Sequence, residues 1–175
     1  MNHSVLILSG GPDSVLNKNS PSIDIPLNQI PIPILGICYG FQVMAQLLGG
    51  EVAKTGLSEY GRTEFTSDSS SKLFSGLDSS FNVWMSHGDH VSTLPDQFNL
   101  IASTPSAPIA AMAHNDKPIY ALQFHPEVTH TKEGNAVLEN FVSRICNCQS
   151  QWKMENLIEQ CILDIKERVG DKKVL

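Results

Sequence analysis

A cysteine set between two glycines constrains this chain more than any other feature. The letters G-I-C-Y-G span residues 36–40, after the apolar run 32–35 and before a helical pattern from Phe41 to Leu48. A turn that leads directly from a strand into a helix is cramped, so it needs small residues on both sides of its central side chain. It lifts the central sulfur above the sheet, at a helix N-terminus whose dipole favours the thiolate. The pattern therefore predicts a nucleophile elbow with Cys38 as the nucleophile.

The rest of the hydrophobic pattern is typical of an α/β fold. Short apolar runs at 5–8 and 119–124 have the length of buried strands, and each ends in a loop of small or polar residues. Helical spacing of apolar residues appears at 135–146 and again at 157–165. Residues 51–112 resemble shorter strands and loops. We expect a mostly parallel sheet flanked by helices.

Composition excludes several classes of protein. The 175 residues include 12 basic and 18 acidic side chains, a net charge of -6 that argues against a nucleic-acid-binding surface. We find no apolar stretch of the roughly 18 residues that a membrane span requires, and no signal-peptide pattern. The cysteine spacing fits neither a zinc site nor a disulfide framework, so we expect free thiols in the cytoplasm. The other three cysteines lie among Ile and Leu at helical spacing and are interpreted as packing residues: Cys146, Cys148 and Cys161.

A cysteine nucleophile needs a base, and the base needs a group that orients it. His125 and Glu127 follow a predicted strand, and Pro126 between them favours extended backbone for His125. Residues i and i+2 of an extended segment share a face, so the carboxylate can fix the imidazole tautomer. For the oxyanion of an acyl intermediate, we expect one donor in the N–H of Tyr39 and a second in Gly10 or Gly11.

Two other interpretations of the motifs have to be weighed. The letters S-G-G-P-D-S at 9–14 resemble the phosphate loop of ATP pyrophosphatases, but such a loop should open a helix, and the polar, proline-limited residues 15–21 are a poor helix. His87, Asp89 and His90 contain metal-ligating side chains, but their spacing is irregular. A loop that contacts the substrate is the preferred interpretation of 86–90.

Three motifs in order resemble one family. G-I-C-Y-G-F-Q from residue 36, M-S-H-G-D from 85 and Q-F-H-P-E-V-T-H-T from 123 are similar to class I glutamine amidotransferases, and within them to the GMP synthases. The resemblance implies a flavodoxin-like fold and a glutaminase in which Cys38 attacks the glutamine amide, His125 is the base and Glu127 orients it. It assigns the oxyanion to the Gly11 and Tyr39 N–H groups. The glutamine's amino-acid end would be held by Gln42, Ser86, Gly88 and Asp89.

The same resemblance implies how the chain is organised. Residues 1–146 would be the amidotransferase domain without the family's first strands, and 147–175 a linker and the start of an ATP pyrophosphatase domain. That further domain would use ATP and magnesium to convert XMP into GMP in purine biosynthesis, whereas we expect no cofactor or metal in this chain. Two alternatives stay open: a non-catalytic remnant that binds a partner, and a free-standing glutaminase subunit.

Overall fold

The computed structural model describes residues 5–54, 58–148 and 154–170. The helices are α1 (Tyr39–Leu47), α2 (Gly134–Glu139), which continues as a π-helical segment (Asn140–Ile145), and α3 (Met154–Val169). Short 3₁₀ turns occupy Leu27–Gln29 and Lys72–Phe74. The strands are β1 (Leu6–Leu8), β2 (Ile34–Ile37), β3 (Glu51–Ala53), β4 (Glu59–Ser67), β5 (Ser80–His87), β6 (His90–Thr93), β7 (Phe98–Ser103), β8 (Ala111–His114) and β9 (Ile119–Leu122).

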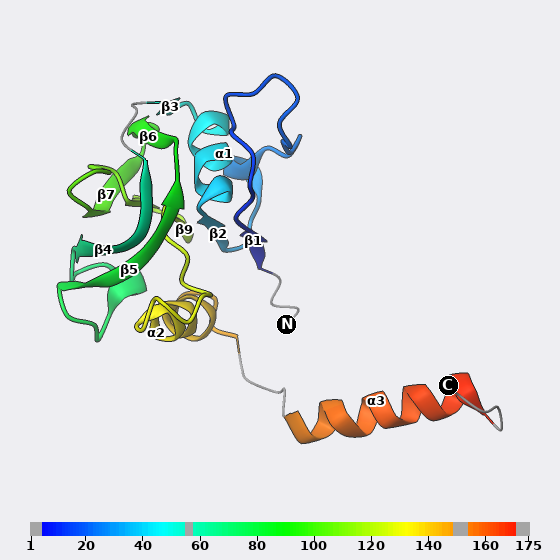
Figure 1. Cartoon of the computed structure of the whole chain (residues 1–175). Coiled ribbons are helices and arrows are strands. Elements are labelled where there is room, and N and C mark those ends of the chain that lie inside the picture. Colours follow the sequence, from blue (N-terminus) through cyan, green and yellow to red (C-terminus); the bar gives the residue numbers. More distant parts are fainter. Residues whose placement is uncertain (1–4, 55–57, 149–153, 171–175) are drawn as a thin grey trace.

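Seven of these strands form one mixed sheet in the order β1-β2-β9-β8-β7-β4-β5, and β3 pairs with β6 separately (Figure 1). β1, β2 and β9 are parallel, so their carboxyl ends meet at one edge of the sheet. β8, β7, β4 and β5 are antiparallel to their neighbours. The α/β prediction is confirmed, but parallel pairing is confined to one half. Antiparallel strands need only short turns, and residues 59–122 supply those without a crossover helix.

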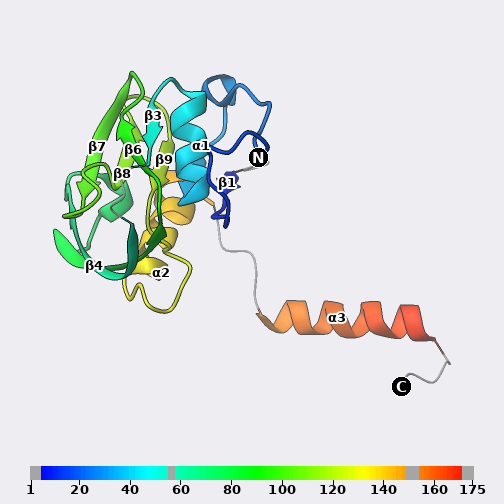
Figure 2. The same cartoon turned by 45° about the horizontal axis from the view of Figure 1, so that its top comes forward.

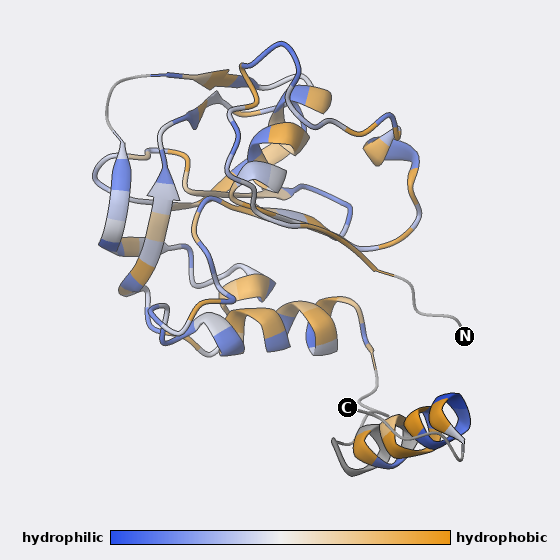
Figure 3. Ribbon diagram, turned by 45° about the vertical axis from the view of Figure 1, so that its right-hand side comes forward, coloured by the Kyte–Doolittle hydropathy of each residue, from blue (hydrophilic) through white to orange (hydrophobic). Residues whose placement is uncertain are grey.

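Both faces of β2 are covered, and this is why β2 is apolar throughout. Ile34 belongs to the core cluster of Phe41 and Met44 of α1, whereas Leu35 belongs to that of Val137 of α2 and Phe141 of the π-helical segment. The alternation of a strand therefore places the two helices on opposite faces (Figure 2). Figure 3 shows apolar residues concentrated in the central strands and the helices that cover them.

Close approach of backbones dictates one glycine of the elbow. A Cβ at Gly40 would lie 2.1 Å from the carbonyl oxygen of Leu8, which no side chain tolerates. The Gly40 N–H instead donates to the carbonyl of Ser9 at 3.2 Å. The start of α1 is thereby held against the end of β1, which brings the loop at 9–13 over the elbow.

The C-terminal helix matches the helical stripe predicted at 157–165. α3 lies apart from the sheet in Figures 1 and 2, and it exposes Ile158, Ile162, Leu163 and Ile165. Gly170, with φ of +54°, follows its last turn, as expected for a helix terminus. None of the described helices is long and apolar enough to cross a lipid bilayer.

Candidate active site

Cys38 occupies the sharp turn that the flanking glycines predict. It is the N-cap of α1, with φ of 50° and ψ of -105°, a conformation rare for a residue other than glycine. Its N–H donates to the carbonyl of Leu122 at 2.7 Å, and its carbonyl accepts from the Gln42 N–H at 3.2 Å. The strain of this backbone is offset by neighbours on both sides, and it directs the side chain to the carboxyl edge of the sheet.

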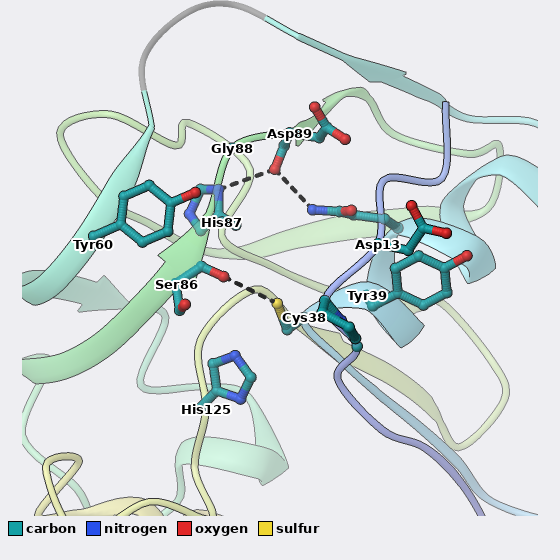
Figure 4. Close-up of a pocket in the computed structure, with 12 residues that line it drawn as sticks. Asp13, Cys38, Tyr39, Tyr60, Ser86, His87, Gly88, Asp89 and His125 are labelled. Carbon is teal, nitrogen blue, oxygen red and sulfur yellow. Dashed lines mark hydrogen bonds between the residues drawn. The ribbon is translucent and has the colours of Figure 1, made fainter. Parts of the chain in front are cut away.

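A cavity of about 440 Å³ opens over this sulfur (Figure 4). It brings together eight of the nine residues predicted for the site: Gly11, Cys38, Tyr39, Gln42, Ser86, Gly88, Asp89 and His125. Glu127, the ninth, stands behind His125. The wall also contains His87, from the loop at 86–90 that was predicted to contact the substrate, and Pro12, Asp13 and Tyr60, to which the sequence assigned no role in the site. The carboxyl edge of a parallel sheet is where α/β proteins place their sites.

His125 is oriented by its carboxylate neighbour and by strand β5. Its Nδ1 lies 2.7 Å from Oε1 of Glu127. The His125 N–H donates to the carbonyl of Trp84, and the Thr131 hydroxyl, itself an acceptor from the Trp84 N–H, donates to the His125 carbonyl. With Nδ1–H directed at the carboxylate, Nε2 is the nitrogen that can accept a proton. Figure 4 shows the imidazole beside Cys38 in the same cavity.

Burial favours the neutral thiol of Cys38, whereas the position of this residue at a helix N-terminus favours the thiolate. Burial raises the pKa of Cys38 from 9.0 to about 11, and the N–H of Tyr39, which favours the thiolate, does not compensate. Sγ lies 3.7 Å from the carbonyl oxygen of Ser86, to which the thiol donates, and accepts from Nε2 of Gln123 at 3.9 Å. Burial is the largest influence on this pKa, and Cys38 is only 4% exposed, so a base that accepts the thiol proton would assist ionisation.

The two glycines of the first loop have different neighbours. A Cβ at Gly10 would lie 2.8 Å from Cε1 of His125 and 3.6 Å from Cβ of Cys38. A Cβ at Gly11 would meet only the ring of Tyr39, at 3.4 Å. Gly10 therefore leaves room for the imidazole, while Gly11 lines the cavity beside Tyr39. The residues alone left the choice of oxyanion donor between them open and the family resemblance favoured Gly11, while the structure shows that their surroundings differ.

Asp89 lines the cavity and has one carboxylate oxygen without a hydrogen-bond partner among the described residues. It is 5% exposed, its Oδ2 accepts from the Ser14 hydroxyl, and its Oδ1 has no hydrogen-bond partner within the described part of the chain. Gln42, predicted to hold the ligand, uses Nε2 on two protein acceptors instead: the Asp89 carbonyl at 2.7 Å and Oε1 of Gln123 at 3.3 Å. Gln42 therefore fixes the segment that carries Asp89.

Sequence reasoning missed the carboxylate behind this wall. His87 is 5% exposed; its Nδ1 lies 3.0 Å from the Asp89 carbonyl oxygen and its Nε2 lies 3.2 Å from Oε2 of Glu59. The Glu59 carboxylate also accepts from the Thr104 hydroxyl. Glu59 precedes His87 by 28 residues and stands in no recognisable motif, so only the pairing of β4 with β5 reveals it.

The two rival interpretations of the motifs lose their structural basis. Residues 12–19 form turns, and no helix follows the 9–14 loop before the 3₁₀ turn at Leu27–Gln29, so the phosphate-loop arrangement does not form. Both ring nitrogens of His87 face protein acceptors, and the described residues contain no group of three or more His, Cys, Asp or Glu that could hold a metal ion.

A buried cysteine on a strand–helix elbow lies in the same cavity as a histidine that is paired with a carboxylate, the arrangement that a cysteine nucleophile requires. The family model described as glutamine amidotransferase class-I matches residues 1–145, and the chain belongs to this family. The fold class predicted from the sequence is thereby confirmed.

The proteins similar to this chain include GMP synthases and a glutamine amidotransferase. The chain is 47% identical over all its 175 residues to GMP synthase [glutamine-hydrolyzing] of Clostridium botulinum, and it covers 34% of that protein. A solved structure, described as that of a putative GMP synthase subunit from Thermoplasma acidophilum, is 36% identical, with a TM-score of 0.69 over 89% of this chain and 76% of the other. A glutamine amidotransferase of Thermotoga maritima, 22% identical with a TM-score of 0.60, shares the fold over 67% of this chain and 64% of its own. The chain thus spans about a third of the length of the curated relatives it matches.

Proposed function

We propose that this chain is a glutaminase that hydrolyses the side-chain amide of glutamine through Cys38, His125 and Glu127. One observation carries the proposal: an imidazole hydrogen-bonded to a carboxylate at 2.7 Å lines the same cavity as a cysteine in a strained elbow. The family and the GMP synthase relatives support glutamine as the amide. The formed cavity also favours a catalytic role over that of a non-catalytic remnant.

The first half of the reaction transfers the glutamyl group to sulfur. Nε2 of His125 takes the proton of the Cys38 thiol, and the thiolate attacks the amide carbon. The resulting oxyanion accepts hydrogen bonds from the N–H groups of Tyr39 and Gly11. When the tetrahedral intermediate collapses, the C–N bond breaks, the imidazolium gives its proton to the leaving nitrogen, and ammonia departs from a glutamyl thioester.

The second half returns the enzyme to its resting form. Water enters from the open side of the cavity, His125 removes one of its protons, and the hydroxide attacks the thioester carbon. The C–S bond breaks, glutamate leaves, and the proton returns to Cys38. Glu127 holds Nδ1–H throughout, so the same nitrogen of His125 faces the reacting atoms in both halves.

The charge of the cavity suits the amino-acid end of glutamine. Asp89 Oδ1 is a buried carboxylate oxygen without a partner among the described residues, and Asp13 lines the same wall. An ammonium group satisfies such an oxygen better than water does, because the paired charge offsets the desolvation. We assign the α-ammonium group of glutamine to Asp89, and contacts with the rest of its amino-acid end to Ser86 and Gly88.

The ammonia would serve GMP formation in purine biosynthesis. In this proposal, a synthetase unit would bind ATP and magnesium, activate XMP and accept the ammonia; the name of the relatives, GMP synthase [glutamine-hydrolyzing], supports glutamine as the source and GMP as the product. The Thermoplasma acidophilum protein is described as one subunit of a GMP synthase, which favours testing a separate synthetase chain as well. Sedimentation of this chain with a purified synthetase would distinguish an associating pair from a self-sufficient chain.

The glutaminase proposal is tested by the amide that the purified chain accepts. We expect ammonia release from L-glutamine, and much slower release from L-asparagine, whose amide lies one methylene closer to its ammonium group. A glutamyl adduct on Cys38, trapped by acid quenching and located by peptide mass spectrometry, would identify the thioester. Ammonia release that is equal in the wild type and in Cys38→Ala would refute the proposal.

A further inference from the structure

A buried hydrogen-bonded chain runs from the core of the sheet to the wall of the cavity. It begins at Thr104, passes through Glu59 and His87, and ends at the carbonyl oxygen of Asp89. Glu59 and His87 are cross-strand partners where the β4–β5 ladder ends. Both side chains are almost completely buried, at 6% and 2% exposed. Burying a charged or polar pair at this depth costs desolvation free energy, which is offset only by well-placed hydrogen bonds.

The chain of donors and acceptors has one consistent direction. The Thr104 hydroxyl accepts from the Ala107 N–H at 2.9 Å, so its own proton points to the Glu59 carboxylate at 3.1 Å. The two ring nitrogens of His87 each face an oxygen acceptor, the Asp89 carbonyl and Glu59 Oε2. An imidazole between two acceptors is satisfied only if a proton lies on each side of the ring. The contact between Nε2 of His87 and Oε2 of Glu59 is therefore satisfied when one proton lies between the two atoms.

The last member of the chain determines where the ligand-binding carboxylate stands. The Asp89 carbonyl is turned inward by two donors, His87 Nδ1 and Gln42 Nε2. This fixes the backbone of Asp89 at the wall of the cavity, and the Ser14 hydroxyl fixes Oδ2, while Oδ1 is buried without a hydrogen-bond partner among the described residues. Neither Glu59 nor Thr104 lines the cavity.

We propose that Glu59 is a positioning residue for glutamine binding, which acts through His87 on the Gly88–Asp89 segment. The proposal rests on the glutaminase function above. Its consequence is specific: loss of the Glu59–His87 hydrogen bond weakens the hold on the amino-acid end of the substrate but leaves Cys38, His125 and Glu127 in place. The Michaelis constant changes, and the turnover number does not.

Three variants on strand β4 test this. Glu59→Met has a similar length but no acceptor, and we expect it to raise KM for glutamine about tenfold or more, with kcat within about threefold of the wild type. In Glu59→Gln the amide NH₂ can donate to His87 Nε2 and the amide oxygen can accept from Thr104, so KM stays within about threefold of the wild type. Glu64→Gln is the matched control, because Glu64 is exposed on the same strand and accepts a hydrogen bond from the Ser80 hydroxyl.

A second measurement does not depend on activity. Amide hydrogen exchange of the ligand-free chain should speed up at residues 88–90 in Glu59→Met, and stay as in the wild type in Glu59→Gln, with β2 and α1 unchanged in both. If Glu59→Met does not melt cooperatively, Thr104→Val removes only the outer donor and should shift KM and exchange in the same direction by a smaller factor.

The outcomes separate the two proposals. Wild-type KM and wild-type exchange in Glu59→Met would overturn the positioning role. So would an equal rise of KM in Glu59→Gln and Glu59→Met, because hydrogen bonding would then not be the cause. If the wild-type chain releases no ammonia, the glutaminase proposal fails, and the exchange of residues 88–90 alone decides the role of Glu59.

Discussion

Two buried cysteines of this chain ionise alike and are surrounded differently. Burial raises the pKa of both Cys38 and Cys146 to about 11. Cys38 stands in a positive-φ turn, in a cavity that also contains His125. Cys146 ends the π-helical segment, packs in the core, and has another thiol, that of Cys148, as its polar neighbour. The comparison teaches that a base within reach, rather than a low resting pKa, distinguishes the proposed nucleophile.

Replacement of each cysteine by alanine tests the difference between Cys38 and Cys146 most directly. We expect Cys38→Ala to lower kcat for ammonia release by roughly 10⁴-fold or more, because no other group can form the thioester. Cys146→Ala should leave kcat within about threefold and destabilise the fold by about 1 kcal/mol through lost packing. Steady-state ammonia assays and urea denaturation measure the two effects. Comparable losses of activity in both variants would contradict the assignment.

Glu127 has two opposite effects on the reactivity of Cys38. Its charge raises the pKa of Cys38 in addition to burial, and its carboxylate orients His125. Glu127→Gln should therefore lower the thiol pKa, measured as the pH dependence of alkylation, and at the same time lower kcat about 10²- to 10³-fold. A kcat that rises together with thiolate content would show that ionisation, and not orientation of the base, limits the reaction.

The next prediction concerns the space around the imidazole of His125, which lines the same cavity as Cys38. Gly10→Ala would place a Cβ 2.8 Å from His125 Cε1, and the displaced ring should reduce kcat about 10- to 100-fold. Gly11→Ala is the matched control, because its Cβ meets only the Tyr39 ring at 3.4 Å and its N–H is retained. Equal activities of the two variants would place the base elsewhere.

The smallest expected effect concerns what the two thiols share. In the folded chain both keep their protons until about pH 11, whereas in the unfolded chain they ionise near 9.0. The stability that the protonated thiols contribute is therefore complete below pH 9 and lost as pH rises toward 11. Urea midpoints should fall between about pH 8 and about pH 10, and less steeply in Cys146→Ala. An unchanged slope in that variant would show that Cys146 ionises freely.

Several features of the fold could be predicted from the sequence, because they depend on residues that are close together in the chain. Apolar runs with small residues at their ends predicted β1, β2 and β9, and the G-I-C-Y-G turn predicted the elbow and α1. The His125–Glu127 contact is also local, since Pro126 separates them by one residue. The antiparallel half was not predicted, because strand order there depends on which distant hairpins pair.

Short sequence patterns alone predicted the chemical groups of the site. These are a cysteine at an elbow, a histidine with its carboxylate, and glycines where two backbones approach closely. The tertiary structure decided the rest. Burial raises the pKa of Cys38, opposite to the effect expected from its helix position, because desolvation is a property of everything packed around the sulfur. The pairing of β4 with β5 joined Glu59 to His87 across 28 residues, a contact that no local pattern encodes. Short sequence segments determine which chemical groups are present, whereas the charge and position of each group depend on contacts between segments that are far apart in the sequence.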